Sequence, residues 1–213
     1  MRATILLVLV AGFCVDTAFA KDVRPYIGVN LHLSDPHGEF RGSNVLNEEA
    51  GASTGLGGQV DVGLASPILS GYIGYRRSFH QADAKGTMPG SSVSVNGDWT
   101  ISRMIFGFRI SVLGSKNTPV KPLIGAGFST GTMTGDATAK FSPNGQSYSE
   151  KATSSAGSGW FYELGFKTKA NEGIDFIGQF QYHEFDAKFA SEVWNGTMCV
   201  SFYTIQLGAA FLL

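Results

Sequence analysis

Polar side chains recur at every second position within several apolar segments of the chain. Asp61, for example, lies between Val60 and Val62. Because the side chains of a β-strand point alternately to its two faces, this spacing separates a polar face from an apolar face. Eight residues form the predicted interior polar set: Asp61, Arg76, Arg103, Arg109, Glu163, Lys167, Gln179 and Gln181. Their chemistry is that of enclosed ion pairs and hydrogen bonds, or that of an ion-selective pore or gate.

Asp61 and Arg76 are the most specific predicted ion pair in this set. They lie at equal distances from the centre of the short turn at residues 66–71. A symmetric hairpin would therefore place them opposite one another, both on the inner face. Charges removed from water must be paired to be stable, so we expect these residues to form a paired network that fills a narrow interior.

A second group of residues resembles the machinery of a hydrolase. His32, Ser34 and Asp35 occur at the end of one segment, and His183 and Glu184 occur at the end of another. A hydroxyl, a base and an acid of these types would support nucleophilic, lipid-modifying chemistry. Histidines at the rim of a membrane protein more often serve as interfacial hydrogen-bonding residues, and the four histidines lack metal-site spacing. We predict no catalytic residue, no metal site and no cofactor.

The run GAGFSTG at residues 125–131 formally resembles a dinucleotide-binding glycine loop. It lacks the following helix and the later acidic partner, and its glycines alternate with a period of two. Small inward residues of a curved strand explain them better. The 16 Lys and Arg residues against 17 Asp and Glu give no basic excess, so we expect no nucleic-acid partner.

Eight segments position these residues, each with an apolar face that alternates with small or polar residues. They are residues 26–34, 56–65, 71–79, 99–112, 121–131, 159–168, 174–183 and 203–213. Each is close to the roughly 9 to 11 residues of a tilted membrane strand. Beyond the N-terminal region, no stretch approaches the roughly 18 apolar residues of a membrane helix. A membrane span must therefore be built from strands.

The connections between these segments alternate in length. Short links occupy residues 66–70, 113–120 and 169–173, and long polar links occupy residues 35–55, 80–98, 132–158 and 184–200. This alternation is typical of outer-membrane barrels with periplasmic turns and extracellular loops. We predict an all-β fold, an eight-stranded antiparallel up-and-down transmembrane β-barrel with short periplasmic turns and long extracellular loops. Eight strands leave an interior only just wide enough for side chains.

The N-terminal residues are typical of a secretory signal. Met1 and Arg2 precede an apolar run at residues 3–13, and Ala-Phe-Ala ends at Ala20 before a charged residue. We predict that residues 1–20 are a cleaved signal peptide and that residues 21–213 form a single outer-membrane barrel domain. Cys14 would leave with the signal, so Cys199 would remain alone and form no intramolecular disulfide.

The last eleven residues form a predicted assembly strand with a continuous apolar face. That face carries Tyr203, Ile205, Leu207, Phe211 and Leu213. The pattern resembles the C-terminal strand by which bacterial outer-membrane barrels are recognised for assembly. Those strands usually end in Phe or Trp, whereas this one ends in Leu.

Several segments together resemble a known family. They are YIGVNLH, GYIGYRRSF, KPLIGAGFSTG, GWFYELGFK and QLGAAFLL. They are similar to segments of the small eight-stranded outer-membrane barrels of the OmpA/OmpX-like superfamily, over nearly all of the chain after the signal. Nothing resembles a periplasmic peptidoglycan-binding domain. The resemblance implies a location in the bacterial outer membrane, and a role as a structural protein, an adhesin, an immune-evasion factor or a narrow pore.

We therefore predict a non-enzymatic outer-membrane barrel whose surface-exposed loops act in adhesion, host interaction or envelope integrity. A small ion or solute channel is the alternative function, and a lipid A-modifying barrel enzyme is a third. The expected partners are outer-membrane lipids including lipopolysaccharide, the barrel assembly machinery, and an extracellular ligand bound through the loops. We expect the protein to be a monomer.

Overall fold

The computed structural model describes residues 23–41, 51–88, 91–111, 119–142, 145–190 and 195–213. Its long strands are β1 (Arg24–His37), β3 (Gly55–Ala65), β4 (Leu69–Met88), β5 (Ser91–Ser111), β6 (Val120–Ser142), β8 (Gly157–Asn171), β9 (Ile174–Ala190) and β10 (Asn195–Leu212). The shorter elements are the 3₁₀ turn η2 (Gly38–Phe40), β2 (Gly51–Ala52) and β7 (Ser147–Thr153).

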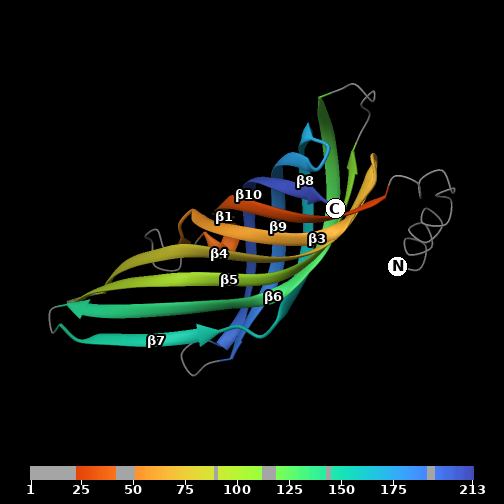
Figure 1. Ribbon diagram of the computed structural model, residues 1–213. Coiled ribbons are helices and arrows are strands. Elements are labelled where there is room, and N and C mark those ends of the chain that lie inside the picture. The colour runs from red at the N-terminus through yellow and green to blue at the C-terminus, as the bar shows by residue number, and fades with distance from the viewer. Residues whose placement is uncertain (1–22, 42–50, 89–90, 112–118, 143–144, 191–194) are drawn as a thin grey trace.

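The eight long strands close into one antiparallel barrel (Figure 1). Each pairs with its neighbours in the order β1, β3, β4, β5, β6, β8, β9, β10, and β10 returns to pair with β1 in a register that sets Tyr26 opposite Leu212. Every wall strand thus has a hydrogen-bonded neighbour on both sides. Where these strands pair, the closed wall has no open edge. The predicted eight-stranded fold is therefore confirmed.

The outer surface of the barrel is apolar. Leu31, Phe108 and Leu207 expose 69%, 65% and 63% of their surface, while the intervening residues of the same strands point inward. Large apolar side chains in such numbers on the outside of a closed sheet require a surrounding that is itself apolar, which is lipid. Among the described residues, no helix is long and apolar enough to cross a membrane.

Short turns and the two ends of the wall lie at the same end of the barrel. Ser66 closes the turn between β3 and β4 by donating its N–H to the carbonyl of Leu69 at 2.7 Å. Glu172 and Gly173 alone connect β8 to β9. Because short turns lie on the periplasmic side of outer-membrane barrels, we call this end, where β1 begins and β10 ends, the periplasmic mouth.

At the opposite end, much of what we predicted as long loops is strand. Residues 80–88 and 91–98 continue the β4–β5 ladder as far as the pair Met88 and Ser91, and β6 extends to Ser142. β3 stops pairing with β4 at Phe79, and β8 stops pairing with β6 at Gly131. The prediction relied on an apolar face, which these polar stretches lack. Hydrogen-bond pairing in water needs no such face, and Thr and Val suit extended backbone.

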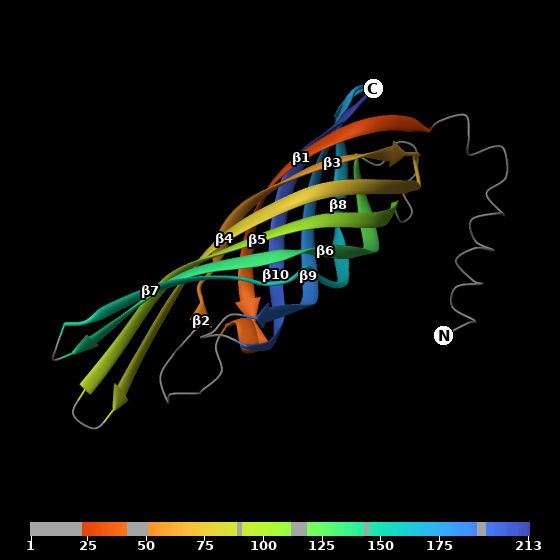
Figure 2. The ribbon, with the colours of Figure 1, turned by 90° about the horizontal axis from the view of Figure 1, so that it is seen from below.

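These continuations form one projecting unit, here called the extracellular sheet. It consists of residues 80–88 of β4, residues 91–98 of β5, residues 132–142 of β6, and β7, which pairs with β6. Figures 1 and 2 show β4 to β7 running out together past the other strands, away from the end that holds the C terminus.

The predicted signal peptide, residues 1–20, lies outside the described residues and remains a prediction.

Inward glycines make room for large side chains of the neighbouring strand. Gly107 lies directly opposite Tyr72, and a Cβ on Gly107 would collide with the Tyr72 ring. Gly125 lies opposite Glu163 and leaves space for its carboxylate in the same way. The residues that fill the lumen are therefore seated over positions that carry no side chain.

Candidate functional site

The structure places the predicted polar set inside the barrel. Seven of its members are buried in the lumen: Asp61, Arg76, Arg103, Arg109, Glu163, Gln179 and Gln181. Lys167 is half-buried at the periplasmic mouth. The set comes from five strands (β3, β4, β5, β8 and β9), so only closure of the barrel brings it together.

Glu163 is the centre of the first group in the lumen, here called the carboxylate network (Asp61, Arg109, Glu163, Gln179 and Gln181). Its Oε1 accepts a hydrogen bond from Arg109 Nε at 2.9 Å. Its Oε2 accepts hydrogen bonds from the Tyr72 hydroxyl at 3.1 Å, Gln179 Nε2 at 3.0 Å and Gln181 Nε2 at 2.9 Å. A buried carboxylate with four donors is fully satisfied.

Asp61 belongs to the same network. Gln59 Nε2 donates to its Oδ1 at 2.6 Å, and Asn30 Nδ2 donates to its Oδ2 at 3.1 Å. Arg109 Nη2 lies 3.7 Å from Asp61 Oδ2, and the Arg109 guanidinium sits 3.8 Å from the centre of the Tyr72 ring. One arginine therefore bridges two buried carboxylates and is itself held against an aromatic face.

The predicted pairing of Asp61 with Arg76 is wrong. Asp61 lies opposite Gly74, and Arg76 lies opposite Gln59. The hairpin turns between Ala65 and Ser70, so its centre precedes the one we assumed and the register differs by two residues. The cation that pairs with Asp61 is instead Arg109, which lies on β5.

Arg76 belongs to a second group deeper toward the extracellular side, here called the arginine layer (Arg76, Arg103, His183 and Phe185). Arg76 Nη2 donates to Gln181 Oε1 at 2.7 Å and to Gln206 Oε1 at 2.6 Å, and Arg76 Nη1 contacts His183 Nε2. No carboxylate among the described residues forms an ion pair with it. Amide dipoles stabilise its charge instead.

Arg103 has fewer polar partners. Its Nη2 donates to the carbonyl of Ser129 at 3.2 Å, and its guanidinium carbon lies 3.9 Å from the centre of the Phe185 ring. Its Nε and Nη1 have no hydrogen-bond partner among the described residues. A cation–π contact therefore carries most of what offsets the burial of this charge.

Side chains fill the lumen at the level of the carboxylate network, at the level of the arginine layer and further toward the extracellular end. Arg76, Phe161, Met133 and Phe202, which come from four strands and different heights, are all 0% exposed. The His183 ring stacks on Phe202 with centroids 4.9 Å apart. A water-filled passage would expose the side chains along its walls, so this part of the described interior is a packed core.

Among the described residues, no hydrogen bond joins the hydrolase-like side chains to one another. His32 Nε2 lies 3.1 Å from Ser78 Oγ, and Ser34 Oγ lies 3.3 Å from Thr204 Oγ1. Glu184 points outward and accepts a hydrogen bond from Tyr182. No group of three or more His, Cys, Asp and Glu residues in the described part of the chain is placed to hold a metal ion.

The C-terminal strand completes the wall between β1 and β9. Its outward residues Ile205, Leu207, Phe211 and Leu213 are exposed, whereas Tyr203 is half-buried against Phe180, with ring centroids 5.5 Å apart. The strand thus presents its apolar face to lipid. Its recognition by the barrel assembly machinery remains a prediction.

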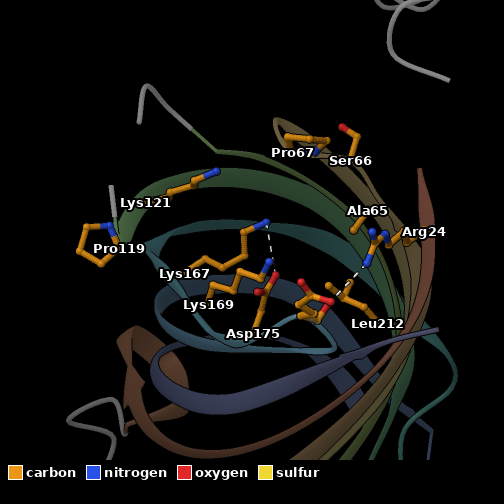
Figure 3. Close-up of a pocket in the computed structure, with 11 residues that line it drawn as sticks. Arg24, Ala65, Ser66, Pro67, Pro119, Lys121, Lys167, Lys169, Asp175 and Leu212 are labelled. Atoms are coloured by element: carbon orange, nitrogen blue, oxygen red, sulfur yellow. Dashed lines mark hydrogen bonds and ion pairs between the residues drawn. The ribbon is translucent and has the colours of Figure 1, made fainter. Parts of the chain in front are cut away.

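Sequence reasoning missed two features of the interior. The first is the ring of neutral partners around the charges, namely Asn30, Gln59, Tyr72 and Gln206; the same alternation that identified the charges points them inward. The second is a hollow at the periplasmic mouth (Figure 3), where basic residues of several strand ends converge. No pattern within one segment marks that convergence.

The comparisons with known proteins agree with this architecture. Residues 5–211 match the family described as outer membrane protein beta-barrel domain, and the chain belongs to that family. The chain is thus a protein of the bacterial outer membrane. No curated protein sequence matches it significantly.

Two of the solved structures that resemble it in fold illustrate the likeness. The outer membrane protein OprG from Pseudomonas aeruginosa matches with a TM-score of 0.60 and 14% identity, over 90% of this chain and 97% of that one. Neisserial surface protein A matches with a TM-score of 0.51 and 13% identity, over 91% of this chain and 100% of that one. At these identities the likeness concerns the fold.

Proposed function

We propose that the protein is a non-enzymatic outer-membrane barrel that binds a partner at the cell surface through its extracellular sheet. The observation that carries this proposal is the continuation of the β4–β5 ladder, without a break in register, from Leu69 to Met88. The membrane-embedded wall therefore holds the projecting strands rigidly. A rigid platform loses little conformational entropy when it binds.

The composition of the extracellular sheet supports contact with water and with a polar partner. β6 and β7 are joined by hydroxyl contacts such as Thr138 to Ser149 at 2.5 Å, and by the ion pair of Lys151 with Asp136 at 3.6 Å. Both charged side chains are more than 60% exposed. β7 pairs with β6 alone among the described strands, so its outer edge offers backbone groups for an added strand.

The test removes the β6–β7 projection and keeps the barrel. Gly135 lies opposite Ala152, so an Asn-Gly turn can replace residues 136–151 and close the two strands as a hairpin. Bacteria displaying the shortened protein should be retained on a cultured epithelial monolayer no better than bacteria without the protein. Faster migration of the unheated protein on gels would show that its barrel is intact.

A matched control keeps the projection and removes only its ion pair, by Asp136→Asn and Lys151→Gln. Exposed pairs of this kind contribute roughly 0 to 1 kcal/mol, so the control should fold as the parent does. Retention that is unchanged after removal of residues 136–151 would contradict a binding role for the projection.

An anion-selective channel is the second candidate. The observation in its favour is the arginine layer, where Arg76 and Arg103 lie in the lumen and form no ion pair with a carboxylate of the described residues. The closed lumen predicts no steady conductance in planar bilayers. Steady anion-selective conductance that changes selectivity in Arg103→Gln would support the channel and would show that the packed interior opens.

A further inference from the structure

The periplasmic mouth contains a hollow of about 260 Å³, here called the periplasmic hollow. It lies between the ends of β1, β6, β8 and β10 and the turns that follow β3 and β8 (Figure 3). Its inner wall includes Ala65 and Leu212, which pack against the apolar cluster around Tyr26 and Ile177. The hollow is therefore a blind recess, separated from the carboxylate network by apolar side chains.

Cations outnumber anions around this recess. Four basic residues line it, namely Arg24, Lys121, Lys167 and Lys169, against the two acidic residues Glu172 and Asp175. The ion pair of Lys167 Nζ with Asp175 Oδ2 spans 3.7 Å. Arg24 Nη1 donates to the main-chain carbonyl of Glu172, at 3.5 Å, and Arg24 forms no ion pair with a described residue.

Lys121 and Lys169 form no ion pair with any described residue. In Figure 3 the basic side chains extend from different strands around the same space. The whole chain has a formal charge of −1, so the surplus of positive charge here is local. Positive charge concentrated in a concave recess attracts anions.

The register adds an independent argument. Lys121 on β6 lies directly opposite Lys167 on β8, and both occupy the inward face of their strands. Like charges placed directly opposite one another destabilise an antiparallel pair. Asp175 pairs with Lys167 and offsets part of this repulsion, and a bound anion would add a favourable contact to Lys121.

We propose that the periplasmic hollow binds a small multivalent oxyanion of the phosphate class. Lysine is a common phosphate ligand and acts as a point charge, and an arginine at the rim adds a planar donor. The volume lies below the roughly 300 to 1,000 Å³ of pockets for drug-sized ligands, so it suits a phosphate or diphosphate group. This site is independent of the extracellular sheet, and its failure would leave the surface role untouched.

Calorimetry of the full barrel, refolded in neutral detergent and titrated with inorganic pyrophosphate, tests the proposal. The double variant Lys121→Gln, Lys169→Gln should bind at least about tenfold more weakly than the parent, because two charge-assisted contacts are lost. The matched control Lys140→Gln, Lys188→Gln removes two exposed lysines beyond the other end of the barrel and should bind as the parent does.

Two results would overturn the site: an absence of pyrophosphate binding by the parent, or equal weakening in both double variants. Migration of unheated protein on gels checks that each variant is folded. Gln at position 121 also removes the opposed like charges, so the variant barrel should resist urea at least as well as the parent in phosphate-free buffer.

The natural phosphate has two possible sources, a free anion or a lipid headgroup at the rim, and a second titration separates them. If micelles containing phosphatidylglycerol, but not those containing phosphatidylcholine, compete with pyrophosphate in the parent, the source is the headgroup. If pyrophosphate binding is the same in both, the source is a free anion. Competition that persists in the Lys121→Gln, Lys169→Gln variant would place the lipid elsewhere and contradict the headgroup source.

Discussion

The carboxylate network and the arginine layer lie in the same lumen, but they neutralise their charges in different ways. In the first, Arg109 faces two carboxylates, and every carboxylate oxygen has a donor. In the second, Arg76 and Arg103 face amide oxygens, a main-chain carbonyl and an aromatic ring. Both groups are almost completely buried.

The difference shows that burial alone does not determine what a charged residue contributes. Removing a member of a fully paired group leaves an opposite charge stranded in a medium of low polarity. Removing a cation that has no counter-charge leaves only neutral groups without a partner. It also removes the cost of burying that cation. Substitutions in the two groups should therefore differ in size and even in sign.

Arg109→Ala should have the largest effect. It leaves Asp61 and Glu163 buried without a cation and should lower the free energy of unfolding by about 3 to 5 kcal/mol, as measured by urea unfolding in lipid vesicles. Adding Asp61→Asn and Glu163→Gln to this variant should restore part of the loss. A loss below about 1 kcal/mol would contradict the pairing, because exposed pairs contribute that little.

Phe108→Arg should have the second-largest effect on stability. It introduces an unpaired charge one residue along β5 from Arg109. Phe108 is on the lipid face and 65% exposed, and an arginine near the bilayer centre costs about 2 to 4 kcal/mol. The same urea titration measures it, with Phe108→Leu as the apolar control. If Phe108→Arg were tolerated as well as Phe108→Leu, the outward face would not be in lipid.

Arg76→Ala should cost less than Arg109→Ala. The change removes the donor of Gln206 Oε1 and one of the two contacts of Gln181 Oε1, which also lies 3.0 Å from His183 Nε2. An unsatisfied buried group costs about 1 to 3 kcal/mol. Arg76→Gln, which can still donate, should lose less. An effect as large as that of Arg109→Ala would show that Arg76 balances a carboxylate after all.

Arg103→Met should have the smallest effect. Methionine keeps the packing against Phe185 and makes favourable sulfur–aromatic contacts. It also removes a guanidinium with two nitrogens that have no hydrogen-bond partner among the described residues. We expect the free energy of unfolding to change by less than about 1 kcal/mol in either direction. Arg103→Ala, which also leaves a void beside Phe185, serves as the control and should be less stable than Arg103→Met.

Alternation along the chain was enough to predict which residues line the lumen. Asp61, Glu163 and Gln179 all point inward as expected, because the parity of a position in a strand fixes its face. Their partners were not predictable. A difference of two residues in the hairpin leaves every side chain on its predicted face but changes its neighbour, and this is why Arg76 was assigned to Asp61.

Two other features were beyond the reach of segment-by-segment reasoning. The strand continuations beyond Phe79 and Gly131 carry no apolar stripe, and a polar strand in water resembles a loop in sequence. The periplasmic hollow joins Arg24, Lys121 and Lys169 from three strands. Their proximity follows from the stagger of the closed barrel rather than from any spacing along the chain.

The packing of the Tyr72 ring over Gly107 has a consequence for engineering. The two positions share one volume, so a methyl group at position 107 is compatible only with a smaller side chain at position 72, and the two substitutions are not independent. Shrinking Tyr72 alone would open a void beside Arg109, at the level of the carboxylate network. A designer who wished to turn this packed interior into a conducting passage would begin there, by enlarging one glycine-backed seat after another along the wall.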